Sequence, residues 1–171
     1  MKKKLILWLF LLCSCSEKNE YFIKPVEGFE LLRYLGKWHE IARTNNNFEK
    51  GCTQVTANYE MRNDGGIDVI NECSKNGKRK KAKGRAYFKD FSNIGSLKVT
   101  FFWPFYGNYY IIYLDENYSN AVVYGGNPKY IWILSRNEKI TKTELDYLLF
   151  QISKLGLDSK TLMISSDAIV P

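Results

Sequence analysis

From residue 36 to residue 135 the chain is a succession of short apolar or alternating runs, and this pattern limits the fold most narrowly. Apolar residues recur at every second position more often than at helical spacing, which predicts strands rather than helices. Turn-forming residues separate the runs, most clearly in Asn63-Asp64-Gly65-Gly66, a strong hairpin signal. We expect eight strands, at about 36–44, 53–62, 66–74, 82–90, 95–103, 108–115, 120–124 and 130–135.

One segment near the end of the chain breaks this pattern. Thr141 and Glu144 have the spacing of a capping box, and Gly156 suits the position just after a helix. Between them, apolar residues recur at helical spacing: Leu145, Leu148, Leu149, Ile152 and Leu155. The sequence therefore predicts one amphipathic helix with a single buried face, followed by a short strand at about 161–165.

Eight consecutive strands with short connections favour an all-β fold, an eight-stranded antiparallel up-and-down β-barrel. The helix is then expected to pack on the outside of the barrel. A β-sandwich is the alternative, but Greek-key folds need long cross-connections, whereas the links here mostly span about three to eight residues. An eight-stranded barrel has room for one small ligand.

The N-terminus has the order of a secretory signal: Lys2, Lys3 and Lys4, then the apolar run 5–12, then small residues. Eight apolar residues are too few to cross a bilayer, which needs about 20. The stretch 12–15 resembles a bacterial lipobox, with Cys15 the better lipid acceptor and Cys13 the alternative; a plain cleaved signal is the other interpretation. Ser16 is compatible with sorting to the outer membrane, facing the periplasm. We expect a signal peptide at 1–14, a lipidated tether at 15–27, a barrel domain at 28–167 and a tail at 168–171.

Charge and cysteine content exclude several functions. The net charge is +7, but removal of the signal peptide leaves 22 basic and 18 acidic residues, a net charge of +4, which weakens a nucleic-acid interpretation. His39 is the single histidine and no C-x-x-C motif occurs, so we expect no metal site and no cofactor. The chain also lacks a G-x-S-x-G motif, and we expect a protein that is not an enzyme.

Cys52 and Cys73 remain in the exported protein, where an oxidising environment favours a disulfide. With the hairpin turn centred near 64.5, Cys52 falls opposite residue 77 and Cys73 opposite residue 56. A bond between them therefore requires a bulge or bend near Cys52.

Residues 35–43 carry a G-x-W motif, and four further motifs follow it in order: Val55–Tyr59, Asp64–Gly66, Phe101–Gly107 and Tyr130–Arg136. This ordered set resembles the bacterial outer-membrane lipocalins related to apolipoprotein D. The resemblance covers about residues 28–167. It implies that Gly36, Trp38 and Arg136 form a structural closed end, with Arg136 stacked on the Trp38 indole as a cation–π contact.

Alternation along the strands, started from an inward Trp38, places a set of mostly apolar side chains inside the barrel. Small residues such as Ala42 and Ala86 are expected to leave space for a ligand, and Asn71 and Tyr59 to supply polar groups. The expected ligand-binding residues are Ala42, Val55, Ala57, Tyr59, Val69, Asn71, Ala86, Phe88, Val99, Phe101, Trp103, Tyr130 and Trp132.

The connection between the third and fourth expected strands, residues 75–83, carries six bases and no acid. Its central residues, Lys78, Arg79, Lys80 and Lys81, predict a basic mouth loop that attracts anionic headgroups. The alternative interpretation is an ordinary solvated loop. The aromatic stretch 103–106 is expected across the mouth, where it suits a bilayer interface or guides a chain into the pocket.

A basic rim above an apolar pocket suits fatty acids or lysophospholipids. We therefore expect a membrane-anchored protein that binds, stores or transports such lipids in the cell envelope, with no nucleic-acid partner. The alternatives are a carrier of another small hydrophobic ligand, such as a tetrapyrrole or isoprenoid, and a structural envelope lipoprotein with a filled barrel. The oligomeric state is not readable from the sequence.

Overall fold

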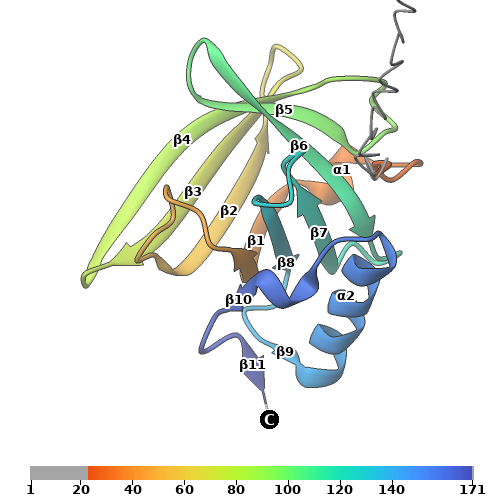
Figure 1. Cartoon of the computed structure of the whole chain (residues 1–171). Helices are drawn as coiled ribbons and strands as arrows, with labels where there is room; N and C mark the ends of the chain where they lie inside the picture. Colours follow the sequence, from red (N-terminus) through yellow and green to blue (C-terminus); the bar gives the residue numbers. More distant parts are fainter. Residues whose placement is uncertain (1–22, 171) are drawn as a thin grey trace, which may run out of the picture.

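A closed β-barrel with one helix on its outside makes up residues 23–170, the part of the chain that the computed structural model describes (Figure 1). Each strand pairs antiparallel with the next, and β1 also pairs with β8, which closes the barrel. Its eight strands are β1 (Gly36–Thr44), β2 (Thr53–Met61), β3 (Ile67–Lys75), β4 (Lys78–Phe88), β5 (Ser96–Phe102), β6 (Phe105–Leu114), β7 (Asn120–Tyr124) and β8 (Ile131–Ser135). The predicted fold is confirmed.

The predicted signal peptide (residues 1–14) and the predicted lipidation site Cys15 lie outside the described residues. The end of the expected tether contacts the barrel. The Val26 N–H donates a hydrogen bond to the Ile111 carbonyl at 2.8 Å, and Glu27 forms an isolated β-bridge with Ile94. Across residues 23–170, no helix has the length and apolar character needed to cross a membrane.

Two hairpin turns set the length of the central strands. Between β2 and β3, Gly65 adopts a φ of 78°, and the Arg62 N–H donates to the Gly66 carbonyl at 2.9 Å. Between β3 and β4, Asn76 and Gly77 have φ values of 52° and 70°, as a two-residue type I′ turn requires. The expected loop at 75–83 is therefore wrong, because β4 begins at Lys78 and contains the basic residues.

Bulges change the direction of side chains in two strands. The pairing of β1 with β8 shifts register between Glu40 and Ala42, so Ala42 packs outside the barrel and Arg43 turns inward. The prediction that Ala42 lines the interior is wrong, since one extra residue reverses alternation. In β2 a shift between Thr53 and Thr56, with Gln54 at a φ of 51°, supplies the expected bulge near Cys52.

The helix α2 (Lys142–Lys154) begins and ends as the sequence predicts. Thr141 accepts a hydrogen bond from the Glu144 N–H, and the Glu144 carboxylate accepts one from the Thr141 N–H, which completes the capping box. After the helix, Gly156 has a φ of 77°, and the Gly156 and Leu157 amides bond back to carbonyls of the last turn, as in a Schellman motif.

The apolar residues divide into two clusters, one on each face of the barrel wall. The interior cluster fills the barrel around Trp38, Tyr59, Ile67, Val69, Ala86, Leu97, Ile111, Ala121, Val123 and Leu134. The outer cluster joins the barrel to α2 through Ile41, Ala42, Ile112, Val122, Ile131, Ile133, Leu145, Leu148 and Ile152. The helix thus covers one side of the barrel (Figure 1) and does not enter it.

Short elements complete the fold at both ends of the described chain. The helix α1 (Leu31–Tyr34) precedes β1, and the 3₁₀-helix η1 (Ser159–Thr161) leads into β10 (Leu162–Ile164), which pairs with the open part of β1. β11 (Ile169–Val170) pairs in parallel with β9 (Ile140–Thr141), so most of the expected tail is held against the segment before α2.

Candidate functional site

The closed end of the barrel is built around the Trp38 ring. The Trp38 side chain is fully buried, and its indole N–H donates to the Tyr34 carbonyl at 2.8 Å. The Arg136 guanidinium lies 4.0 Å from the Trp38 ring centroid and donates to the carbonyls of Lys37 at 2.9 Å and Arg33 at 2.8 Å. Gly36 adopts a φ of 90° where a Cβ would meet the Arg136 guanidinium at 3.4 Å. These contacts hold a cation over the end of the barrel.

A layer of three tyrosines lies next to this end. The Tyr109 hydroxyl is 2.8 Å from the Tyr34 hydroxyl and 2.7 Å from the Tyr59 hydroxyl. Burial raises the pKa of Tyr59 to about 12, and raises the pKa of Tyr34 and Tyr109 well above the usual value, so all three remain neutral hydroxyls near neutral pH.

The cavity between these rings, which Ala86 and Val99 also line, has a volume of about 10 Å³. Such a volume holds at most about one water molecule. Near the closed end the small side chain of Ala86 therefore leaves no ligand-sized space, because the tyrosine rings occupy it. Any ligand that enters from the other end meets the tyrosine layer as the floor of the barrel.

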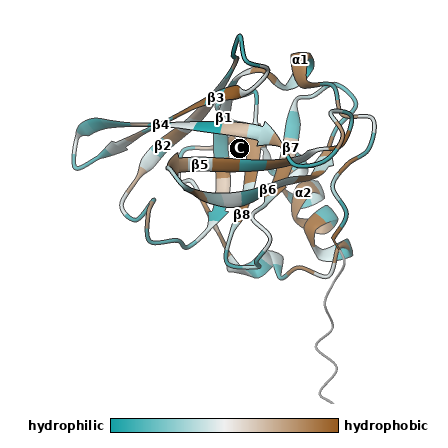
Figure 2. Ribbon diagram, turned by 90° about the horizontal axis from the view of Figure 1, so that it is seen from above, coloured by the Kyte–Doolittle hydropathy of each residue, from teal (hydrophilic) through white to brown (hydrophobic). Residues whose placement is uncertain are grey.

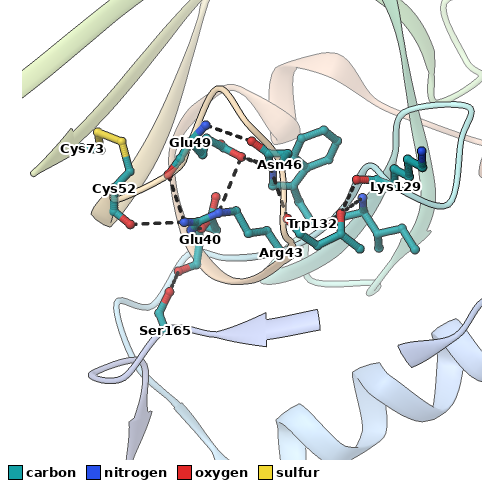
Figure 3. A network of polar contacts seen from close by, with 11 residues as sticks. Glu40, Arg43, Asn46, Glu49, Cys52, Cys73, Lys129, Trp132 and Ser165 are labelled. Atoms are coloured by element: carbon teal, nitrogen blue, oxygen red, sulfur yellow. Dashed lines mark hydrogen bonds and ion pairs between the residues drawn. A yellow bond between two sulfur atoms is a disulfide. The ribbon is translucent and has the colours of Figure 1, made fainter. Parts of the chain in front are cut away.

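Towards the open end, the interior contains a buried charge cluster (Figure 3). Arg43 forms an ion pair with Glu40 and a longer one with Glu49, at 3.8 Å. Arg43 also donates to the carbonyls of Glu49 at 3.2 Å and Cys52 at 3.3 Å. The charge partner of Glu40 is thus Arg43, three residues further along the same strand.

The loop between β1 and β2 completes the cluster. The Glu49 N–H donates to the Asn46 side-chain oxygen at 2.9 Å, and the Trp132 indole N–H donates to the Glu49 carboxylate at 3.1 Å. Sequence reasoning missed Arg43, Asn46 and Glu49. The three-residue spacing of Glu40 and Arg43 was an available signal for an ion pair, but nothing in the alternation revealed the bulge that turns Arg43 inward.

The charges of the cluster do not balance when both acids are ionised. Burial, followed by the nearby Glu49 carboxylate, raises the pKa of Glu40 to about 7, although the Arg43 guanidinium opposes the rise. Glu40 therefore changes its protonation state near neutral pH, inside the barrel.

The Cys52–Cys73 disulfide is confirmed, with a Cα–Cα distance of 5.5 Å. It ties the end of the β1–β2 loop to β3, directly beside the Cys52 carbonyl that accepts from Arg43. Figure 3 shows the disulfide at the edge of the charge cluster. The bond thus limits the movement of the loop that carries Asn46 and Glu49.

Most of the expected ligand-binding residues lie on the inner face of the barrel, at different depths. Tyr59, Val69 and Ala86 belong to the buried interior cluster, and Ala57, Phe88, Val99, Phe101 and Trp132 pack against it. Val55 is buried, and the side-chain oxygen of Asn71 is buried without a hydrogen-bond partner among residues 23–170. Phe88 contacts Phe29 near the closed end, with ring centroids 6.2 Å apart.

Two aromatic residues of the expected set lie outside the barrel wall. Trp103 is 81% exposed because β5 ends at Phe102, after a bulge, and Trp103 falls at the tip of the β5–β6 hairpin. Its predicted place inside the barrel is wrong. Tyr130 precedes β8 and stacks between Phe48 and Trp132, with ring centroids 6.0 and 6.3 Å away. It lies at the rim of the open end.

The four bases at the start of β4 divide between the two faces of the hairpin. In the β3–β4 register, Lys80 lies opposite Cys73 and Lys78 lies opposite Lys75. Because side chains alternate along a strand, Lys78 and Lys80 are on the same face as the inward residues of β4, whereas Arg79 and Lys81 point outward. Arg79 and Lys81 both form ion pairs with Glu72, at 3.0 and 3.2 Å. In residues 23–170 neither Lys78 nor Lys80 has an ion-pair partner. The tip of this hairpin is hydrophilic (Figure 2).

A groove of about 740 Å³ lies along β2, β3 and β4, next to the tip of the β5–β6 hairpin. Charged side chains on or next to these strands line it, together with aromatic residues of the β5–β6 hairpin, including Arg62, Asp68, Lys83, Arg85, Phe101, Trp103 and Tyr106. The groove is far more polar than the barrel interior. No group of acids, histidines or cysteines suited to a metal ion occurs in residues 23–170.

The barrel, its G-x-W closed end and its open mouth define a class of binding protein. The lipocalin-like domain family matches residues 29–167, and the chain belongs to that family. Solved structures agree on the fold. Insecticyanin from the tobacco hornworm Manduca sexta has a TM-score of 0.69 at 23% identity, with 84% of each chain covered. Lobster apocrustacyanin A1 has a TM-score of 0.60 at 19% identity, with 86% of this chain and 92% of that chain covered.

Sequence relatives narrow the class to a bacterial group. The outer membrane lipoprotein Blc of Vibrio cholerae is 47% identical over 162 residues, which cover 93% of this chain and 94% of that protein. The outer membrane lipoprotein Blc of Escherichia coli is 40% identical over 152 residues, 87% of this chain and 86% of that protein. Mouse apolipoprotein D is 34% identical, covering 85% of this chain and 80% of that protein.

This homology places the chain among the outer membrane lipoproteins, anchored in the membrane. It also makes the chain a binding protein for a small hydrophobic ligand and not an enzyme.

Proposed function

We propose that this lipocalin binds a single-chain anionic lipid, a fatty acid or a lysophospholipid, in the open half of its barrel, and stores or transports it in the cell envelope. The acyl chain lies above the tyrosine layer, against inward residues such as Val55, Ala57 and Trp132. The headgroup remains at the mouth. Apolar walls with a few polar groups suit such an amphiphile.

The observation that carries the proposal is the position of Lys78 and Lys80. Both lie on the inward face of the β3–β4 hairpin, in line with Ala82 and Gly84, and neither is neutralised by an ion pair within residues 23–170. Two free cations above an apolar interior attract a carboxylate or a phosphate, and they leave an uncharged headgroup without a partner. Arg79 and Lys81, on the other face, are already paired with Glu72.

A comparison of two double variants tests this assignment. Lys78→Ser with Lys80→Ser should weaken hexadecanoate binding by about twofold to thirtyfold at low salt, since an exposed cation contributes about 0.2–1 kcal/mol per contact. Hexadecanol binding should not change. Arg79→Ser with Lys81→Ser, the matched control, should leave both affinities unchanged.

Isothermal titration of delipidated protein measures these affinities. Unchanged hexadecanoate affinity in the inward double variant would contradict the proposal. An equal loss for hexadecanol would do so as well, since it would show that the lysines act through the fold and not through charge.

The filled half of the barrel favours a second candidate, a structural envelope lipoprotein. The 10 Å³ cavity within the tyrosine layer is what a barrel without a ligand would show. This alternative predicts no saturable binding of hexadecanoate or hexadecanol, so the same titration separates the two functions.

A further inference from the structure

The tip of the β5–β6 hairpin exposes large aromatic side chains that the ligand site does not use. Phe102 and Trp103 are each 81% exposed, Phe105 is 78% exposed and Tyr106 is 42% exposed. A contiguous exposed apolar patch of this kind marks an interaction site. The hairpin loop projects beyond the barrel body at the upper left of Figure 1.

We propose that this hairpin tip inserts its aromatic side chains into the interface of the lipid bilayer and forms a second contact with the membrane beside the lipid anchor. The side chains suit that place. Tryptophan and tyrosine have an apolar ring with one polar group, and they gather where hydrocarbon meets the hydrated headgroups. Phenylalanine adds apolar area on both sides of the turn.

The backbone of the hairpin is suited to partial dehydration. After a bulge, β5 and β6 pair again at Phe102 and Phe105, which leaves only Trp103 and Pro104 in the turn. Backbone groups that are already hydrogen-bonded across the hairpin enter an interface without the cost of unpaired N–H and C=O groups. Proline also brings no N–H of its own to the turn.

Charge around the hairpin favours a membrane over water. No aspartate or glutamate occurs from residue 91 to residue 114, so no carboxylate has to leave water when the tip inserts. The Lys98 ammonium lies 5.3 Å from the Tyr106 ring centroid. Cations beside interfacial aromatic rings attract the phosphate groups of the bilayer surface.

Basic residues also line the groove beside the tip. Lys83 and Arg85 share the groove with Trp103 and Tyr106, and both are exposed. Two carboxylates line it too: Asp68 forms an ion pair with Arg62 at 2.8 Å, and Glu60 accepts a hydrogen bond from the neutral Asn58 amide at 2.6 Å. The charged residues that line the groove, three bases (Arg62, Lys83 and Arg85) and two acids (Glu60 and Asp68), therefore have a small positive net charge.

The length of the tether keeps the barrel near the bilayer. Ile23, where the described chain begins, lies eight positions after the predicted lipidation site Cys15. A fully extended segment of that length spans at most about 28 Å. Because the anchor holds the barrel this close, even a weak aromatic contact acts at a high effective concentration.

Fluorescence quenching in vesicles tests the proposal with the full-length lipidated protein. The protein is placed in phosphatidylcholine–phosphatidylglycerol vesicles with or without brominated acyl chains, and the emission of Trp103→Phe is subtracted from that of the wild type. The proposal predicts that the Trp103 contribution is blue-shifted and largely lost with brominated lipid, and that it resists aqueous iodide.

Two results would overturn the proposal. Emission of Trp103 that iodide quenches and brominated lipid does not would show that the tip is in water. A blue-shifted emission without bromolipid quenching would show a protein partner, such as a second copy of the chain. Trp132→Phe, which removes a fluorophore inside the barrel, is the matched control and should leave the bromolipid-sensitive part intact.

Discussion

The two ends of the barrel hold an arginine side chain in different ways. At the closed end, Arg136 stacks on Trp38 and donates to backbone carbonyls, none of which changes charge with pH. At the open end, Arg43 faces the carboxylates of Glu40 and Glu49, and one of them titrates near neutral pH. The closed end is thus a fixed plug, whereas the charge inside the open end depends on conditions.

The largest expected effect is a loss of unfolding free energy when the tryptophan of the closed end is replaced. Trp38→Ala should lower the free energy of unfolding by roughly 3–5 kcal/mol, because it opens a cavity in the interior cluster and leaves Arg136 without its ring. Trp103→Ala, the matched change at an exposed tip, should alter it by less than about 0.5 kcal/mol. Urea unfolding followed by far-ultraviolet circular dichroism measures both. Equal losses would contradict the contrast between plug and tip.

The next effect concerns the disulfide at the open end. Replacing Cys52 and Cys73 by serine should cost about 3 kcal/mol, because the bond closes a loop between residues 21 apart in the sequence. Reductant should lower the stability of the wild type to that of the double variant and leave the variant unchanged. If a mass measurement shows that reductant has broken the bond, but the stability of the wild type is unchanged, the disulfide does not stabilise the fold.

The smallest effect is a pH dependence that only the open end should show. The pKa of Glu40 is about 7 in the folded protein, above its ordinary value of about 4.5, so the folded state holds a proton that the unfolded state releases. Stability therefore falls as pH rises from about 4.5 to about 7, and changes little with this group above that range.

Comparison of two glutamine variants isolates this contribution. In Glu40→Gln, the unfolding free energy measured at pH 4.5 and at pH 7 should no longer show the fall that the wild type shows. Glu72→Gln is the control, since Lys81 and Arg79 lower the pKa of Glu72, and its stabilisation is lost only as pH falls. Should Glu40→Gln keep the slope of the wild type, Glu40 is not the titrating group.

Regular parts of the fold were predictable from the sequence because local signals specify them. Period-two runs marked the strands, and Thr141, Glu144 and Gly156 marked both ends of α2. The bulge at Glu40 and Ala42 was not predictable, since alternation assumes that no residue is inserted. For the basic segment, composition suggested a loop, but Asn76-Gly77 makes the turn in two residues.

The floor of the candidate site was unpredictable for another reason. Tyr34, Tyr59 and Tyr109 come from α1, β2 and β6, and of the three only Tyr59 was expected from the sequence to supply a polar group to the interior. Their hydroxyls meet only after the barrel closes. The depth of the pocket therefore depends on contacts between distant segments, whereas the class of the fold follows from the pattern of strands.

Native mass spectrometry of the lipoprotein, isolated from cell envelopes without delipidation, tests the central claim most directly. The account predicts one non-covalent adduct per chain with the mass of a fatty acid or lysophospholipid, lost on denaturation while the covalent anchor remains. A chain without any such adduct, or one that carries a tetrapyrrole or an isoprenoid instead, would contradict it.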